Sequence, residues 1–203
     1  MKKLVGICVC FLLMGQLQAQ SVLKHSVYLN GDLLAGNYVA GELGLNYVYQ
    51  GKFAVKVSYI GADRKAISTP DDFSTGLIGA LTLGLFEPRD EMESYSFQIG
   101  RIFATGKQEK ACYNISFGVV YSKLNEFTNW QKINTAGVAW NYSYDKYKAD
   151  RIGVILNPRI EILAGRFFGV TFSSTLLVNK DRCFIGVGVG VMGGILRGRL
   201  QAK

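Results

Sequence analysis

The sequence predicts an all-β protein: a closed, antiparallel, up-and-down transmembrane β-barrel of about eight strands, preceded by a signal peptide. Two patterns point to the barrel. Bulky apolar residues alternate with small or polar ones along eight segments, and both long connections between these segments fall on the same side, opposite a side where every connection is short. Alternation with a period of two places the two residue types on opposite faces of a strand. A third observation, a short apolar run behind a positive start, points to export.

Residues 1–19 have the three-part pattern of a secretory signal peptide. Lys2 and Lys3 give the positive start, residues 4–14 form an apolar or small run, and a small polar stretch ends at Ala19. We expect cleavage after Ala19. The apolar run is much shorter than the ~20 residues that a membrane-spanning helix needs. Residues 20–203 are then left as a single barrel domain.

The alternation is clearest in the middle of the chain. There Tyr113, Ile115 and Phe117 are separated by Asn114 and Ser116. The same two-faced pattern defines eight predicted strands, at residues 26–34, 38–49, 53–60, 95–100, 113–121, 151–162, 168–178 and 184–196. Several of these segments approach the ~9–11 residues that a tilted strand needs to cross the hydrocarbon layer.

The connections and the aromatic residues support a barrel with two different ends. Long connections at 61–93 and 122–150 fall on the same side if the first strand begins in the periplasm, and this asymmetry is typical of outer-membrane barrels. Aromatic residues of the apolar face cluster at strand ends, as expected at the two bilayer interfaces. The external set is Tyr59, Tyr95 and Tyr121, and the periplasmic set is Tyr47, Tyr49, Phe53, Phe103, Tyr113 and Phe168.

These features resemble the small outer-membrane β-barrel domain proteins, the eight-stranded OmpA- and OmpX-like class. The residues that carry the resemblance are the signal peptide, the alternating segments and the final strand with Gly186, Gly188 and Gly190. The resemblance covers nearly all of residues 20–203 and implies a location in the bacterial outer membrane. The chain departs from the class in ending at Lys203, where such barrels often finish on an aromatic residue.

With the apolar face turned toward lipid, a set of charged residues points into the lumen. An eight-stranded barrel has room inside only for its own side chains, and buried charges must be paired. We therefore expect a polar network that plugs the barrel, in which Lys56 and Arg159 pair with Glu42 and Glu161. A narrow, gateable pore is the alternative. The predicted network consists of Asp32, Glu42, Lys56, Arg151, Arg159 and Glu161.

The two long connections hold the candidates for external interaction. The first contains an apolar run at 77–86, for which three placements are open: the outer-leaflet interface, the barrel mouth or a partner. Aromatic residues of the second either bind sugars or proteins or extend the strands above the membrane. The candidates are Leu77, Leu81, Phe86, Trp130, Trp140, Tyr142 and Tyr144.

Charge and composition exclude several function classes. Removal of Lys2 and Lys3 leaves 23 − 2 = 21 basic against 15 acidic residues, a net charge of +6. In an exported protein this balance favours outer-membrane lipid and lipopolysaccharide as partners rather than nucleic acid. No Cys/His spacing suits a metal, and His25 is the only histidine. We therefore predict no metal, no cofactor and no catalytic residue.

The predicted function is a non-enzymatic, integral outer-membrane protein, most simply a monomer, with a structural, adhesive or partner-binding role through its external loops. Two alternatives remain open. A soluble, periplasmic lipocalin-like barrel would turn its bulky face inward to bind an apolar ligand. A lipid A-modifying barrel enzyme that resembles acyl hydrolases would need a His–Ser pair near the outer leaflet, whereas His25 lies at the periplasmic start of the first strand.

Overall fold

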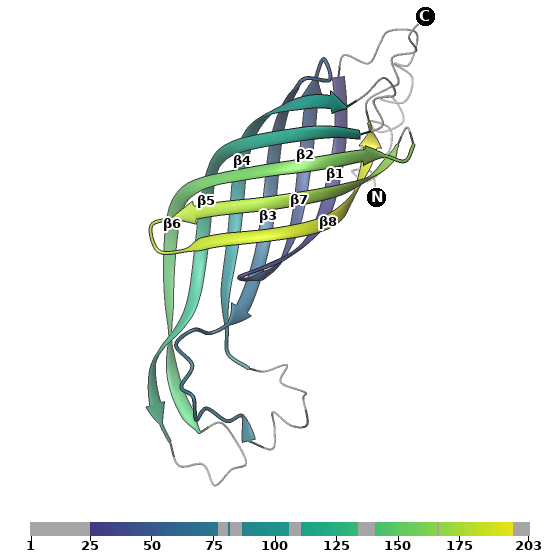
Figure 1. Ribbon diagram of the computed structural model, residues 1–203. Coiled ribbons are helices and arrows are strands. Elements are labelled where there is room, and N and C mark those ends of the chain that lie inside the picture. The colour runs from purple at the N-terminus through teal and green to yellow at the C-terminus, as the bar shows by residue number, and fades with distance from the viewer. Residues whose placement is uncertain are drawn as a thin grey trace, which may run out of the picture.

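The computed structural model describes residues 25–76, 81, 87–105, 111–133, 141–165 and 167–196. In this part of the chain, each strand pairs with its sequence neighbours and the last strand closes onto the first, giving an eight-stranded antiparallel barrel (Figure 1). The strands are β1 (His25–Gly36), β2 (Val39–Tyr49), β3 (Phe53–Lys65), β4 (Arg89–Thr105), β5 (Ala111–Lys132), β6 (Tyr142–Leu163), β7 (Phe168–Asn179) and β8 (Cys183–Ile195). The predicted fold class is confirmed. The signal-peptide segment, residues 1–19, lies outside the described residues.

The two long connections are shorter than the sequence predicted. β3 and β4 pair as far as Lys65 and Arg89, and β5 and β6 pair as far as Lys132 and Tyr142. The connections are therefore residues 66–88 and 133–141 rather than 61–93 and 122–150. Outside lipid neither face of a strand needs to be apolar, so the alternation that marks the membrane part fades there while the pairing continues.

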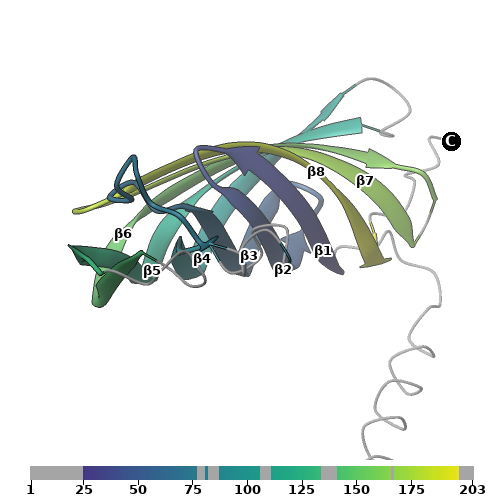
Figure 2. The same cartoon turned by 90° about the horizontal axis from the view of Figure 1, so that it is seen from below.

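The barrel has two different ends. The end with both termini of the described chain, His25 and Leu196, also carries the tight turn at Gln50 and Gly51, and we call it the terminal end. The opposite end carries the two long connections, and we call it the loop end. Figure 1 shows β5 and β6 projecting far beyond the other strands at the loop end, and Figure 2 shows the same cartoon from below. Among the described residues, no helix has the length and apolar character needed to cross a membrane.

The outer wall is an apolar band. The bulky members of each alternating segment face outward as predicted, with Leu33 75% and Ile152 78% exposed. Aromatic residues lie at the loop-end margin of this band, where the rings of Tyr59 and Tyr95 are 5.3 Å apart. A continuous apolar surface of this extent is not tolerated by a soluble monomer. It also argues against the lipocalin-like alternative, which places the bulky face inside.

The interior has three layers rather than one. A buried apolar cluster fills the loop end, and we call it the loop-end plug; it includes Leu34, Ile60, Met92, Ile155, Leu177 and Phe184. A second cluster, the terminal-end plug, includes Tyr28, Val48, Ile102, Cys112, Met192 and Leu196. Most of the buried polar and charged residues lie between the plugs, and we call this layer the polar belt. Along β1 the order is Tyr28, then Asn30 and Asp32, then Leu34.

Close strand packing gives a test of the interior. A Cβ atom on Gly118 would overlap the backbone of Phe97 on β4, whereas a Cβ on the outward-facing Gly41 meets nothing within 4 Å. We expect Gly118→Ala to lower the free energy of unfolding by about 1–3 kcal/mol through overpacking, and Gly41→Ala to have little effect. Urea unfolding of the refolded barrel measures both. Equal midpoints for the two variants would contradict this packing.

Candidate functional site

The charged residues of the polar belt form a chain of ion pairs across the lumen. Lys56 on β3 places its Nζ 2.5 Å from Oε1 of Glu42 on β2. Arg159 on β6 reaches across the barrel, with Nη2 3.4 Å from Oδ2 of Asp32 and 3.6 Å from Oε2 of Glu42. None of these side chains is more than 2% exposed. A buried pair of this kind is stable only while both partners remain.

Neutral groups donate hydrogen bonds to the carboxylates of Glu161 and Asp32. The Tyr28 hydroxyl and the Asn114 amide donate to Oε1 of Glu161, at 2.8 and 3.0 Å. The Asp32 carboxylate accepts hydrogen bonds from Asn30 and Thr171. The expected pair between Lys56 and Glu42 is thus present. Arg159 pairs with Asp32 and Glu42 instead of the expected Glu161, which is held by neutral groups.

Arg151 does not belong to this layer, and its placement in the lumen network was wrong. Its side chain is 29% exposed at the loop end, and its Nε lies 2.5 Å from Oδ2 of Asp181. It also donates to the Tyr147 hydroxyl at 3.3 Å. Arg151 has the inward parity of β6 and lies opposite the buried Ser122, at the level of the loop-end plug, but its guanidinium turns out of the lumen to Asp181. Parity alone gives the direction in which a side chain starts and not where its charged end lies.

The second candidate region lies outside the barrel wall. Beyond β4, strands β5 and β6 continue as a two-stranded ribbon formed by residues 126–132 and 142–147, which we call the ribbon. A cluster of aromatic rings joins the ribbon to the connection 66–76. The ring of Phe73 is 5.3 Å from Trp130, Trp130 is 5.2 Å from Tyr144, and Phe127 meets Tyr144 edge-on at 4.8 Å. Such ring pairs stabilise beyond the area that they bury.

A polar clamp closes the same contact. The Asp72 carboxylate accepts from Lys132 Nζ at 2.6 Å and from the Tyr142 hydroxyl at 2.5 Å. Asn141 donates to the Asp72 carbonyl and accepts from the Ser74 amide, both at 2.7 Å. Hydrogen bonds from Lys132 and Tyr142 hold the pKa of Asp72 below its ordinary value. The hydrogen bond to Asp72 in turn raises the pKa of Tyr142.

The external interaction candidates have different placements. Trp130, Tyr142 and Tyr144 are half-buried in the aromatic cluster, so they hold two connections together rather than standing free. Leu81 is 77% exposed. Leu77, Phe86 and Trp140 lie outside the described residues. Sequence reasoning missed Phe73 and Asp72, because nothing in the connection 66–76 marks which of its residues meet the ribbon.

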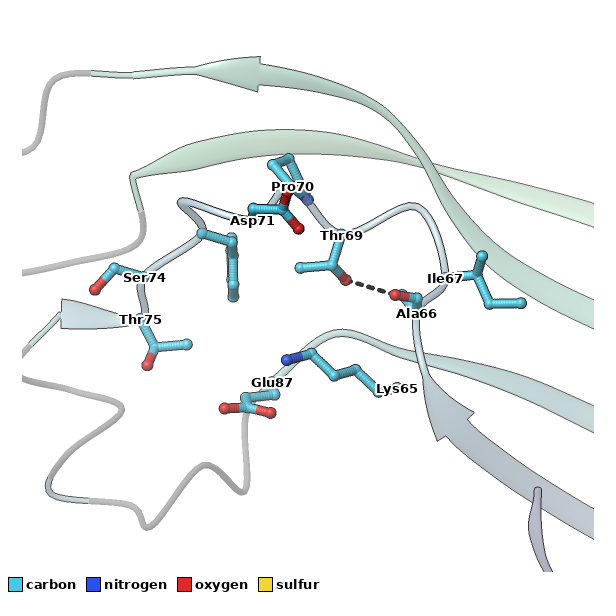
Figure 3. A pocket seen from close by; sticks show the side chains of 10 residues that line it. Lys65, Ala66, Ile67, Thr69, Pro70, Asp71, Ser74, Thr75 and Glu87 are labelled. Atoms are coloured by element: carbon cyan, nitrogen blue, oxygen red, sulfur yellow. Dashed lines mark hydrogen bonds between the residues drawn. The ribbon is translucent and has the colours of Figure 1, made fainter. Parts of the chain in front are cut away.

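A polar pocket of about 480 Å³ lies beside this cluster (Figure 3). It is formed by the connection that follows β3 together with Glu87. Thr69 Oγ1 donates to the Ala66 carbonyl at 2.8 Å and shapes the turn that forms one wall. Its charged lining residues are Lys65, Asp71 and Glu87.

Catalytic chemistry has little support in the described residues. The sole histidine of the sequence, His25, lies at the terminal end with Nδ1 2.7 Å from the Tyr47 hydroxyl. Its neighbours are aromatic rings of the outer wall, with Tyr49 at 5.5 Å. Within the part of the chain that the structure describes, no group of three or more His, Cys, Asp or Glu side chains could hold a metal ion.

Loss of Glu42 tests the polar belt. In Glu42→Ala, Lys56 and Arg159 lose their shared carboxylate inside a closed barrel. We expect the free energy of unfolding to fall by about 3–5 kcal/mol, the range for a buried pair that loses one partner. Urea titration of the refolded barrel gives the midpoint. Glu93→Ala, at an exposed position, is the control, and an unchanged midpoint for Glu42→Ala would refute the pairing.

The clamp makes the loop end sensitive to acid. Because the pKa of Asp72 is lowered in the folded state, the clamp is present above the ordinary Asp pKa of ~3.9 and is lost as the pH falls through the lowered value. In a Trp140→Phe background, Trp130 is the only tryptophan. Its emission should stay constant down to about pH 4 and shift to the red below.

In that background, Asp72→Asn should show the red-shifted emission at every pH, without an acid step. Asp145→Asn, which removes only the negative charge from the side chain that accepts from the Asn129 amide, should behave as the parent does. An acid step that persists in Asp72→Asn would show that another group titrates.

Comparison with known proteins supports the fold. No family model matches the sequence, and no curated protein matches it. The N-terminal β-barrel domain of Pseudomonas aeruginosa OprF is similar in structure, with a TM-score of 0.52 and 9% identity over 83% of this chain and 95% of that one. Ail, the attachment invasion locus protein of Yersinia pestis, has a TM-score of 0.50 and 11% identity over 84% and 97%. The chain therefore has the fold of the small eight-stranded outer-membrane β-barrels, and its apolar wall is the surface that such a barrel turns toward lipid.

Proposed function

We propose that this protein is a non-enzymatic barrel of the bacterial outer membrane that presents its ribbon to a protein partner outside the cell. The single observation that carries the proposal is the construction of the loop end. The aromatic cluster and the Asp72 clamp hold the connection 66–76 against the ribbon, so the strands that leave the membrane are braced. A braced surface costs less ordering entropy on binding than separate mobile loops do.

The barrel itself serves as the anchor. Its polar belt lies between two apolar plugs, and the charged side chains of the belt pair with one another rather than with a ligand. This arrangement favours a structural role over conduction. With the terminal end in the periplasm, Lys123 and Lys148 face outward just beyond Tyr121, at the level of lipopolysaccharide phosphates. Such lysines attract anionic head groups.

The ribbon offers one open edge to a partner. Strand β6 pairs with β5 from Tyr142 onward, but it pairs with β7 only from Gly153 onward. The outer edge of β5 is covered instead, because Ser68 bonds the Phe127 carbonyl and Asp90 accepts from the Phe127 amide. An unpaired edge can accept an added strand from another protein. The name of the Yersinia pestis barrel shows that a protein of this fold has been linked to attachment.

Labelling of intact cells tests location and orientation. Asn129 is exposed in the ribbon and Lys52 is exposed at the terminal end. In a Cys183→Ser background, a membrane-impermeant maleimide should label Asn129→Cys on intact cells. Lys52→Cys should be labelled only after the outer membrane is permeabilised. The reverse pattern, or recovery of the protein in the soluble fraction, would refute the placement.

Photo-cross-linking tests the partner. A benzoyl-phenylalanine residue at Ser143, on the open edge of the ribbon, should yield one adduct of defined mass on cells in their natural setting. The same residue at Val57, on the lipid-facing wall, is the matched control and should yield no protein adduct. If position 143 gives no adduct while the barrel is correctly inserted, the partner-binding role fails and the structural role remains.

A further inference from the structure

A long apolar groove crosses the outer wall of the barrel. Its volume is about 930 Å³. It runs between two rows of outward side chains, each following the register from strand to strand. The first row joins Leu33, Val189, Phe172, Ile160 and Tyr113, which are direct cross-strand neighbours on β1, β8, β7, β6 and β5. The row thus passes from the loop-end part of β1 to the terminal end of β5.

The side chains of the second row project less from the wall than those of the first row, and this widens the groove. It joins Ala35, Val187, Ser174, Pro158 and Ile115. Three of these five side chains are small or compact. The β-branched members of the two rows, Val187, Val189, Ile115 and Ile160, are stiff because their χ1 angles are restricted. The strands beneath all the wall residues are fixed by a closed ladder. The shape of the groove is therefore present before any ligand arrives.

Pro158 interrupts the wall in the middle of the groove, and the carbonyl opposite it still accepts a hydrogen bond. A proline within a paired strand removes one ladder hydrogen bond, and the register of the flanking pairs places Pro158 opposite Ser174. The Asn157 side chain donates to the Ser174 carbonyl at 3.1 Å and supplies the missing bond from inside the barrel. The floor of the groove thus stays compatible with hydrocarbon, and no charged side chain projects from its walls.

A cation lies where the groove ends. Arg101 on β4 is the cross-strand neighbour of Ile115, and Phe103 is the neighbour of Tyr113. The Arg101 side chain is exposed on the outer wall, and its Cζ is 5.5 Å from the Phe103 ring centroid. A charge on the lipid-facing side is costly unless it reaches the interface or meets a partner. Its position among the aromatic residues of the terminal end matches the level of lipid phosphates.

The groove is long enough to hold an acyl chain. From β2 to β5 it crosses five inter-strand steps of about 4.8 Å, or about 24 Å. Strands of such barrels are inclined by about 40°, so a groove at right angles to them is inclined by about 50° and covers about 15 Å of depth. It begins at the terminal-end interface, and its other end, at Ala35 and Val39, lies beside the turn between β1 and β2.

We infer that this groove is a binding site for one phospholipid of the periplasmic leaflet, with its phosphate on Arg101 and an acyl chain between the two rows. The inference goes beyond the proposed function and rests on it only in requiring that the barrel spans a membrane. Charge complementarity at Arg101 and continuity with the lipid-facing wall identify this occupant. A second copy of the barrel offers a convex wall, which does not fill a hollow in another convex wall.

Native mass spectrometry of the detergent-purified barrel tests the site, with 1-palmitoyl-2-oleoyl-phosphatidylglycerol as the titrated probe. The parent should retain one lipid. Arg101→Gln should weaken that binding about fivefold, the effect of one basic residue near lipid phosphate. Ala35→Phe combined with Ser174→Phe fills the groove with side chains that lipid tolerates, and should abolish the retained lipid.

Two matched controls make the result specific. Lys123→Gln removes an outward-facing cation at the opposite interface, and Val57→Phe enlarges an outward side chain away from the groove; both should bind as the parent does. Heat-modifiable migration on gels confirms that each variant is folded. Unchanged binding in Arg101→Gln or in the double variant overturns the inference, as does preferential retention of lipid A. Failure of the parent to insert into vesicles would instead overturn the proposed function.

Discussion

Closure of the backbone ladder between β8 and β1 is the constraint on which everything else in this molecule depends. Hydrocarbon offers no hydrogen bonds, so every amide and carbonyl at that depth must be satisfied by a neighbouring strand. The register Leu33 to Val189 and onward around the wall meets that requirement. Once the ring is closed, the period of two leaves each side chain only two directions, outward to lipid or inward to a narrow lumen.

The inward direction is more demanding than the sequence pattern suggests. A polar lumen would be open to water at both mouths, yet Phe184 and Leu177 at one end and Met192 and Val48 at the other are fully buried. The apolar plugs remove the belt from solvent, and this raises the cost of any charge without a partner. The pairing of Lys56 with Glu42 is therefore a consequence of the plugs as much as of the charges themselves.

The fold could be predicted from the sequence because lipid imposes a simple rule: outward-facing side chains in the membrane part are bulky and apolar. All eight predicted segments lie within or close to observed strands, and the aromatic residues at strand ends lie at the margins of the band. It was insufficient wherever that rule does not apply. Strand pairing of residues 122–132 and 142–150 depends on partners rather than on an apolar face. The exposed position of the Arg151 guanidinium depends on its ion pair with Asp181, and the contact of Phe73 with Trp130 joins residues whose proximity no local pattern specifies.

The reach of Arg159 has a consequence for how the barrel assembles. Its partner Asp32 is 127 positions away in sequence, at the other end of the chain, and Glu161 is 133 positions from Tyr28. A partly formed sheet of the first strands would expose acids to hydrocarbon, and one of the last strands would expose a guanidinium. Neither half is a resting state in the bilayer, so zippering of the last strand onto the first and neutralisation of the interior should be a single concerted event.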